Sequence, residues 1–136
     1  MELLEIYIDG GSRGNPGPAG IGVVMYRGGE VIKNISQFIA EATNNVAEYT
    51  SLIYGLQEAL IQRAKRVKVY TDSELLFKQV KKVYKIKDAQ LKALHAQAQH
   101  MISSFENFDI EYIARELNKE ADKLAAKAIQ QDVFNF

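Results

Sequence analysis

The chain contains no cysteine among its 136 residues. Disulfide bonds and thiolate metal sites are therefore excluded, and a reducing compartment is compatible with this composition. The chain also lacks a run of roughly eighteen apolar residues, which a membrane-spanning helix would need. It begins with no basic segment followed by an apolar stretch, as a secretory signal would. We therefore expect a cytoplasmic protein with no membrane partner.

An excess of charge of one sign is missing as well, because 17 basic residues balance 17 acidic residues. This balance argues against a strongly basic protein that binds nucleic acid without specificity. Apolar residues make up 47% of the chain and charged residues 25%, and both values are ordinary for a globular protein. Length and composition predict a single domain over residues 1–136, with a short tail at 131–136, and a monomer.

A hydrophobic stretch that ends in an acid stands near the start of the sequence. Residues 3–9 predict a buried strand, and Asp9 is its last residue. Residues 10–19 follow as a loop rich in glycine and proline. The loop is not a nucleotide-binding P-loop, because no Gly-Lys-Ser/Thr follows and the next element is a strand. Asp9 could therefore cap the turn or belong to a site.

The rest of the pattern predicts alternating strands and helices. Strands are expected at 20–27, 30–39, 67–71 and 108–114, and helices at 44–63, 74–82, 91–105 and about 119–130. Gly28-Gly29 predicts a two-residue hairpin turn. A hairpin followed by alternating strands and helices predicts an α/β fold, with a mixed sheet and helices on its faces. Sites in such sheets lie at the carboxyl ends of strands, where Asp9 and Asp72 both stand.

Four acids at scattered positions are candidates for one site. Asp9 and Asp72 follow strands, and the other two, Glu48 and Asp122, lie at the margins of the apolar faces of helices. Each helix acid alone also fits a solvated helix face. If the four converge, their like charges raise one another's pKa values unless a cation is present. Carboxylates without cysteine or a well-placed histidine select Mg²⁺ or Mn²⁺, and two such ions about 4 Å apart would clamp a phosphodiester.

Four short motifs occur in an order and at spacings that resemble the type 1 ribonuclease H family, over about residues 4–130. They are Asp9-Gly10…Gly14-Asn15-Pro16-Gly17, Thr43-Asn44-Asn45-Val46-Ala47-Glu48, Thr71-Asp72-Ser73 and Asn118-Lys119-Glu120-Ala121-Asp122. The resemblance implies a ribonuclease-H-like fold. Its five-stranded sheet would have the order 3-2-1-4-5, with strands 1–3 antiparallel and helices on both faces. The resemblance also implies metal-dependent cleavage within the RNA strand of an RNA–DNA hybrid, leaving 5′-phosphate and 3′-hydroxyl ends.

The resemblance assigns roles to residues by position. Asp9 would bridge two metal ions, Glu48 and Asp72 would complete one metal site, and Asp122 would hold the ion associated with the attacking water. Five residues of the glycine-rich segment would read the minor groove of the hybrid: Gly10, Gly11, Ser12, Arg13 and Asn15. Three at the start of the first helix would contact the hybrid or a phosphate of its DNA strand: Thr43, Asn44 and Asn45. The same three residues could equally cap the helix.

Some positions depart from the family pattern. The connection before the last helix is Arg115-Glu116-Leu117, without the histidine that many members carry there. His95 and His100 are expected on the surface of the preceding helix. Glu74 stands where an amide side chain often contacts a base, so this contact is expected to be weakened, altered or absent. A basic connector follows, and its lysines could bind phosphates or simply be solvated: Lys81, Lys82, Lys85 and Lys87.

Two hypotheses of different classes follow. The first is an active ribonuclease H that uses Mg²⁺ or Mn²⁺, has an RNA–DNA hybrid as its partner and needs no obligate protein partner. The second is a catalytically weak domain of the same fold that binds nucleic acid or a protein. The presence of all four acids favours the enzyme, because a degenerate domain would have little reason to retain them.

Overall fold

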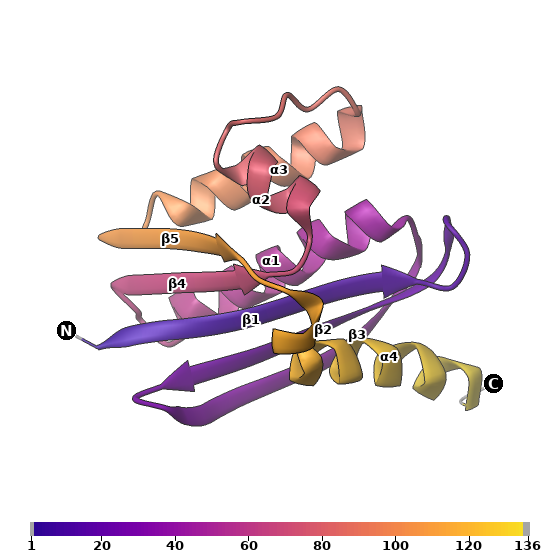
Figure 1. Cartoon of the computed structure of the whole chain (residues 1–136), viewed down its shortest axis with the longest axis horizontal. Coiled ribbons are helices and arrows are strands. Elements are labelled where there is room, and N and C mark those ends of the chain that lie inside the picture. Colours follow the sequence, from indigo (N-terminus) through magenta and orange to yellow (C-terminus); the bar gives the residue numbers. More distant parts are fainter. Residues whose placement is uncertain (1, 135–136) are drawn as a thin grey trace.

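One mixed sheet organises the part of the chain that the computed structural model describes, residues 2–134. The strands are β1 Leu3–Ser12, β2 Gly17–Arg27, β3 Glu30–Ala42, β4 Arg66–Thr71 and β5 Asn107–Tyr112. The helices are α1 Asn44–Ile61, α2 Glu74–Val80, α3 Ala89–Ile102, the short 3₁₀ helix η1 Arg115–Leu117, and α4 Lys119–Phe134. The strand order is β3-β2-β1-β4-β5 (Figure 1). The β1–β2 and β2–β3 pairs are antiparallel and the β1–β4 and β4–β5 pairs are parallel, which confirms the predicted sheet.

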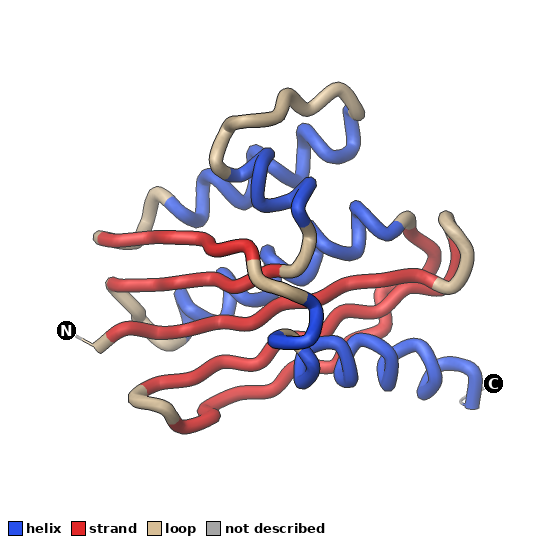
Figure 2. Tube along the Cα trace, viewed as in Figure 1, coloured by secondary structure: helices blue, strands red, loops and turns tan. Residues whose placement is uncertain are grey.

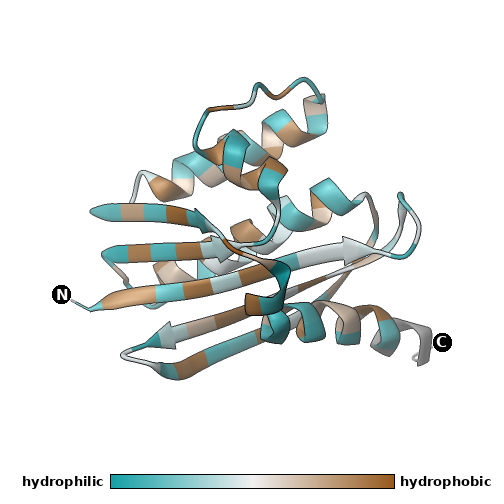
Figure 3. Ribbon diagram, viewed as in Figure 1, coloured by the Kyte–Doolittle hydropathy of each residue, from teal (hydrophilic) through white to brown (hydrophobic). Residues whose placement is uncertain are grey.

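The strands form because apolar and polar residues alternate along them. On β1, Leu4, Ile6 and Ile8 are buried on one face, while the residues between them face the other way. The same alternation is visible along β4 and β5 in Figure 3. Helix α1 covers the apolar face with Leu52 and Leu56, and α3 packs against α1. Helix α4 lies on the opposite face, against β2, β3 and β1 (Figure 2).

Local signals account for the connections. Gly28 and Gly29 both have positive φ, 59° and 81°, and join β2 to β3 as the predicted two-residue turn. Thr43 is the N-cap of α1, where its hydroxyl accepts a hydrogen bond from the Val46 amide at 3.2 Å. None of the helices within residues 2–134 is long and apolar enough to cross a membrane.

Several predicted boundaries were wrong. Strand β1 continues to Ser12 rather than ending at Asp9, because Gly10–Ser12 pair with residues 19–21 of β2. Strand β3 extends to Ala42, and α3 ends at Ile102, so that Phe105 is buried in the turn that follows the helix. Helix α4 continues through residues 131–134, which were expected to form a tail. The remainder of that tail, residues 135–136, lies outside the described residues.

Helix α4 approaches the sheet closely through Gly22 of β2. A Cβ atom at this position would lie 2.1 Å from the carbonyl oxygen of Ala121 and 2.7 Å from the amide nitrogen of Ala125. Both atoms belong to the helix backbone and have little freedom to move. The position of α4, and therefore of every residue at its start, depends on the absence of a side chain at Gly22.

Replacing Gly22 with alanine should therefore destabilise the protein by about 3 kcal/mol, because the helix must move away from the sheet. Urea denaturation followed by circular dichroism measures the effect. Gly28→Asn is the matched control, since nothing lies within 4 Å of a Cβ there and asparagine suits the turn. The control should change stability by less than about 0.5 kcal/mol. A Gly22→Ala variant as stable as the wild type would contradict this description of the α4 contact.

Candidate active site

Three acids from three different elements meet beside β1. Carboxylate oxygens of Asp9, Glu48 and Asp72 lie within 4.8 Å of one another. Asp9 is on β1, one residue beyond Ile8, where the pairing with β4 ends. Asp72 directly follows β4, and Glu48 lies near the start of α1. Because β1 continues where β4 stops, Asp9 faces an open edge of the sheet that the other two acids reach.

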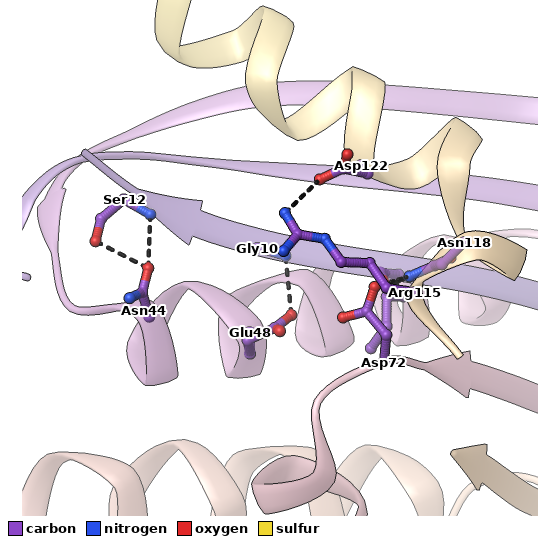
Figure 4. Close-up of polar contacts among 9 residues, drawn as sticks. Gly10, Ser12, Asn44, Glu48, Asp72, Arg115, Asn118 and Asp122 are labelled. Atoms are coloured by element: carbon purple, nitrogen blue, oxygen red, sulfur yellow. Dashed lines mark hydrogen bonds and ion pairs between the residues drawn. The ribbon is translucent and has the colours of Figure 1, made fainter. Parts of the chain in front are cut away.

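Gly10 joins β1 to α1 at this point. Its amide donates a hydrogen bond to Oε1 of Glu48 at 2.9 Å (Figure 4). A Cβ atom on residue 10 would lie 2.3 Å from both the carbonyl carbon and oxygen of Ala47, so only glycine allows the helix this close. The Gly10 amide, which the sequence analysis assigned to the minor groove of a substrate, is therefore already bonded to a carboxylate of the site.

Asp122 completes the group from the other side of the sheet. It lies in the first turn of α4, where the helix dipole favours a negative charge. Burial, then Asp72 and then Asp122, raise the pKa of Asp9, so the Asp122 carboxyl lies close to that of Asp9. Among the described residues, carboxylate oxygens of Asp9, Glu48 and Asp72 lie within 4.8 Å of one another, and Asp122 borders this group.

Asn118 is hydrogen-bonded to the site, and the sequence did not identify this residue as one that positions an acid. The side chain is 1% exposed, and its Nδ2 donates to the Ile8 carbonyl at 2.8 Å and to Oδ2 of Asp72 at 3.2 Å. These bonds tie the connection before α4 to β1 and to Asp72. In the sequence Asn118 is visible only as the first residue of a family motif, because a buried asparagine cannot be distinguished from a helix cap by its sequence context.

Arg115 is the second residue that the sequence analysis missed. Its guanidinium Nη2 lies 3.9 Å from Oδ1 of Asp122, and Figure 4 shows the side chain extending across the space between Asp72 and Asp122. The side chain is 82% exposed. Its positive charge lowers the pKa values of Glu48 and Asp72. The sequence analysis noted only that this connection lacks a histidine.

The pKa values show how unfavourable this group of carboxylates is without a cation. Burial, then the charge of Asp72 and the neighbouring Asp122 carboxyl, raise the pKa of Asp9 from its ordinary 3.8 to about 8. Burial and the charges of Asp9 and Asp72 raise the pKa of Glu48 well above its usual range. Burial also raises the pKa of Asp72, while Asn118 and Arg115 oppose the increase. Close carboxyl groups of this kind retain protons at neutral pH unless a cation replaces them. The oxygen donors therefore suit a hard divalent ion.

Proteins of known structure have the same fold and a similar sequence. Residues 7–128 match the family described as reverse transcriptase-like. The structure of LC11-RNase H1, isolated from compost, is 42% identical, with 98% of this chain and 99% of that chain covered and a TM-score of 0.92. RNase H1 from Halobacterium salinarum is 34% identical, with 95% and 98% covered and a TM-score of 0.92. The chain belongs to the ribonuclease H family. Curated relatives in this family can be longer: the chain spans 35% of the bifunctional protein Rv2228c of Mycobacterium tuberculosis, with 43% identity over 128 residues.

The residues that the ribonuclease H resemblance assigns to the substrate form a second cluster, beyond the acids. Oδ1 of Asn44 accepts hydrogen bonds from the Ser12 amide at 2.9 Å and the Ser12 hydroxyl at 3.1 Å. The Asn44 amide donates to Oδ1 of Asn15 at 3.0 Å. These bonds hold the β1–β2 loop against the start of α1. Thr43, Asn45 and Asn15 line a hollow of about 260 Å³ that the start of α3 closes. Gly11 lies in β1 and Arg13 is exposed in the loop.

The remaining predicted positions lie farther from the acids. Glu74 is exposed in the first turn of α2. Nζ of Lys81 lies 2.8 Å from Oδ1 of Asp109, and the other three lysines of the connector are exposed: Lys82, Lys85 and Lys87. His100 is exposed as expected, but His95 is half-buried with its ring against Tyr49, because α3 packs on α1.

The raised pKa of Asp9 predicts how stability depends on pH. A carboxyl group with a higher pKa in the folded state stabilises that state at low pH. This stabilisation is lost as the pH rises from about 4 towards 8. Asp9→Asn removes the charge, so at pH 8.5 with a chelator it should raise the melting temperature by about 3 °C or more. Thermal scans across this pH range measure the effect. Asp109→Asn is the control, since the Lys81 ammonium lowers the Asp109 pKa and its removal should not stabilise. An equal rise in both variants, or no rise in Asp9→Asn, would contradict the charge repulsion.

Proposed function

We propose that this protein is a ribonuclease H that hydrolyses the RNA strand of RNA–DNA hybrids within the strand, leaving 5′-phosphate and 3′-hydroxyl ends. The observation that carries the proposal is the group of carboxylates within 4.8 Å at the end of β4. LC11-RNase H1, whose structure is known in complex with an RNA/DNA hybrid, supports the choice of substrate. It is 41% identical, with 96% of this chain covered and a TM-score of 0.90. A monomer in the cytoplasm remains the prediction from composition.

The acids fit two Mg²⁺ or Mn²⁺ ions. We assign Asp9 to both ions, Glu48 and Asp72 to one of them and Asp122 to the other. When bound, such ions activate the attacking water and stabilise the charge that develops on the leaving oxygen. The proton that the raised pKa holds on Asp9 without metal would leave, since ligating carboxylates must be ionised.

The protein's own hydrogen bonds would hold these ligands in place. The Gly10 amide is hydrogen-bonded to Oε1 of Glu48, which leaves Oε2 for a metal ion or for the 2′-hydroxyl of the RNA. Asn118 fixes Oδ2 of Asp72. Fixed ligands keep the reorganisation needed on substrate binding small, and pre-organised electrostatics of this kind are usually the largest contribution to catalysis. A 2′-hydroxyl close to Glu48 would also distinguish RNA from DNA.

The cluster around Asn44 would hold the hybrid next to the acids. We assign Gly11, Ser12, Arg13 and Asn15 to the minor groove, Asn44 and Asn45 to the strands, and Thr43 to a DNA phosphate. Lys82, Lys85 and Lys87 are exposed and would add phosphate contacts, which salt would weaken. Lys81 would contribute less, because it pairs with Asp109. Glu74 would weaken a contact to a base.

Cleavage of an end-labelled RNA–DNA hybrid tests the proposal directly. With Mg²⁺ or Mn²⁺ the wild type should cut within the RNA strand, and Asp9→Asn and Asp72→Asn should each lower the rate by about 100-fold or more. Asp109→Asn is the control, because Asp109 pairs with Lys81 away from the site. Equal cleavage by all variants would refute the site assignment. Tight binding of the hybrid without cleavage under either metal would favour the alternative, a catalytically weak binding domain.

Arg115 should act by positioning and charge. Arg115→Gln removes the charge that lowers the pKa values of Glu48 and Asp72, so more protons compete with metal. The rate at pH 7 should fall by about tenfold, and the pH–rate profile should move to higher pH. Arg115→Lys, which keeps the charge, should restore the profile in large part. A uniform loss of rate at all pH values in both variants would mean that the charge of Arg115 has no such role.

A further inference from the structure

Half of one sheet face has no helix over it. Helix α4 packs on β2, β3 and β1, whereas Figure 1 shows no helix in front of β4 and β5 on that face. Three tyrosines form a row on this face, Tyr26 from β2, Tyr7 from β1 and Tyr70 from β4. The ring of Tyr7 stacks on Tyr70 with centroids 4.4 Å apart, and it meets Tyr26 edge-on at 5.5 Å. The exposed sheet surface is therefore aromatic, although it lies outside the proposed catalytic group.

A cavity of about 390 Å³ lies between this aromatic row and the start of α4. The rings of Tyr7 and Tyr26 form one side. The opposite side is the segment from Glu116 to Ala121, in which Leu117 is 68% exposed. This volume is within the range of pockets that bind small molecules or single side chains of a partner. A large exposed apolar side chain beside aromatic rings is also typical of contact sites between proteins.

The charges that line the cavity are mostly negative. Three carboxylates and one ammonium line it, a net charge of −2: Glu5, Glu116 and Glu120 against Lys119. Glu5 also accepts a hydrogen bond from the Tyr70 hydroxyl. Burial, and then the charge of Glu5, raise the pKa of Tyr7, as expected where the potential is negative. The faces of tyrosine rings add a further negative field that attracts cations. A nucleic-acid strand would be repelled by this lining.

Asn118 in the cavity wall has an unused acceptor. Both donor bonds of its Nδ2 are occupied, by Ile8 and Asp72, but Oδ1 accepts no hydrogen bond from any described residue. The side chain is 1% exposed, and a buried polar atom without a partner is unusual in a folded protein. The oxygen is itself buried, so a bound group would reach it only if the cavity wall moved.

We propose that this cavity binds a basic side chain, an arginine or a lysine, presented by a segment of a partner protein. The cation would lie beside Tyr7 and Tyr26, with its N–H groups directed to Glu5. The exposed Leu117 would contact the apolar part of the same segment. Because Asn118 also holds Asp72, the partner would be held directly beside the proposed active site.

Titration of the ¹⁵N-labelled protein with short capped peptides tests this proposal. The probes are acetyl-Gly-Arg-Gly-amide and the same peptide with citrulline, which has nearly the shape of arginine without its charge. The arginine peptide should shift the amide signals of residues 5, 7, 26 and 116–121 with a saturable curve. The citrulline peptide should bind about tenfold more weakly. Absence of shifts with arginine, or equal shifts with both peptides, would overturn the proposal.

Variants of the cavity and a titration with an RNA–DNA hybrid test whether the peptide signal comes from this cavity. Tyr26→Leu and Glu120→Gln should each weaken binding of the arginine peptide by about threefold or more, and the exposed position of Glu120 makes that variant safe for folding. Tyr112→Leu is the matched control, since Tyr112 contacts Phe77 on the other side of the sheet. Equal weakening by the control would contradict the site.

If an RNA–DNA hybrid, rather than the arginine peptide, shifts the same amides, the surface belongs to the substrate and the proposal fails. The peptide result does not depend on cleavage activity.

Discussion

Repulsion between carboxylates is the constraint around which this structure is arranged. Asp9, Glu48 and Asp72 come from three elements, and folding brings their oxygens within 4.8 Å. Such a group is tolerated only if other interactions fix it and a cation or protons neutralise it. The fixing interactions are local and specific: the Gly10 amide on Glu48, Asn118 on Asp72, and the nearby charge of Arg115. The same repulsion would be relieved by a hard divalent ion, which is the basis of the proposed metal site.

The difference in length between β1 and β4 creates the site. Their parallel pairing stops at Ile8 and Thr71, but β1 continues for four residues along β2. The sheet therefore has an open edge beyond Ile8, and the polar segment of the β1–β2 connection lies next to the start of α1. The glycine-rich part of the chain thus serves two purposes. It lets α1 approach through Gly10, and it extends the edge on which a substrate would lie.

Local patterns predicted the hairpin, and the family resemblance predicted the sheet order and the proximity of Asp9, Glu48 and Asp72, because short motifs make these features recognisable. The sequence did not predict the end of β1, since Gly10 and Gly11 are poor strand formers and only pairing with β2 keeps them extended. Arg115 and Asn118 were missed for a different reason. Their roles depend on where η1 lies relative to Asp72 and Asp122, and that placement is set by the packing of α4 against Gly22. The tyrosine row was also not anticipated, because Tyr7, Tyr26 and Tyr70 become neighbours only through sheet pairing.

The two faces of the sheet differ in how far helices cover them, which would leave one face free to bind a second partner. On one face α1 packs against β1 and β2 and α2 packs against β4 and β5, whereas α4 covers only part of the other face. The cavity beside the uncovered part is lined by tyrosines and more acidic than basic side chains, although Lys68 lies over the Tyr70 ring, whereas the connector between α2 and α3 carries a group of exposed lysines. A nucleic acid and a basic protein segment would therefore be attracted to different surfaces, so the two could bind without competing.

The most direct measurement of the central claim is the release of protons when Mn²⁺ binds to the protein without nucleic acid. Calorimetric titration at pH 7 in two buffers with different ionisation enthalpies reports this number. The pKa of Asp9, raised to about 8, and the raised pKa of Glu48 predict saturable binding with release of at least about one proton. Saturable binding without proton release, or no binding, would contradict the account of a carboxylate group that is protonated until a metal ion replaces the protons.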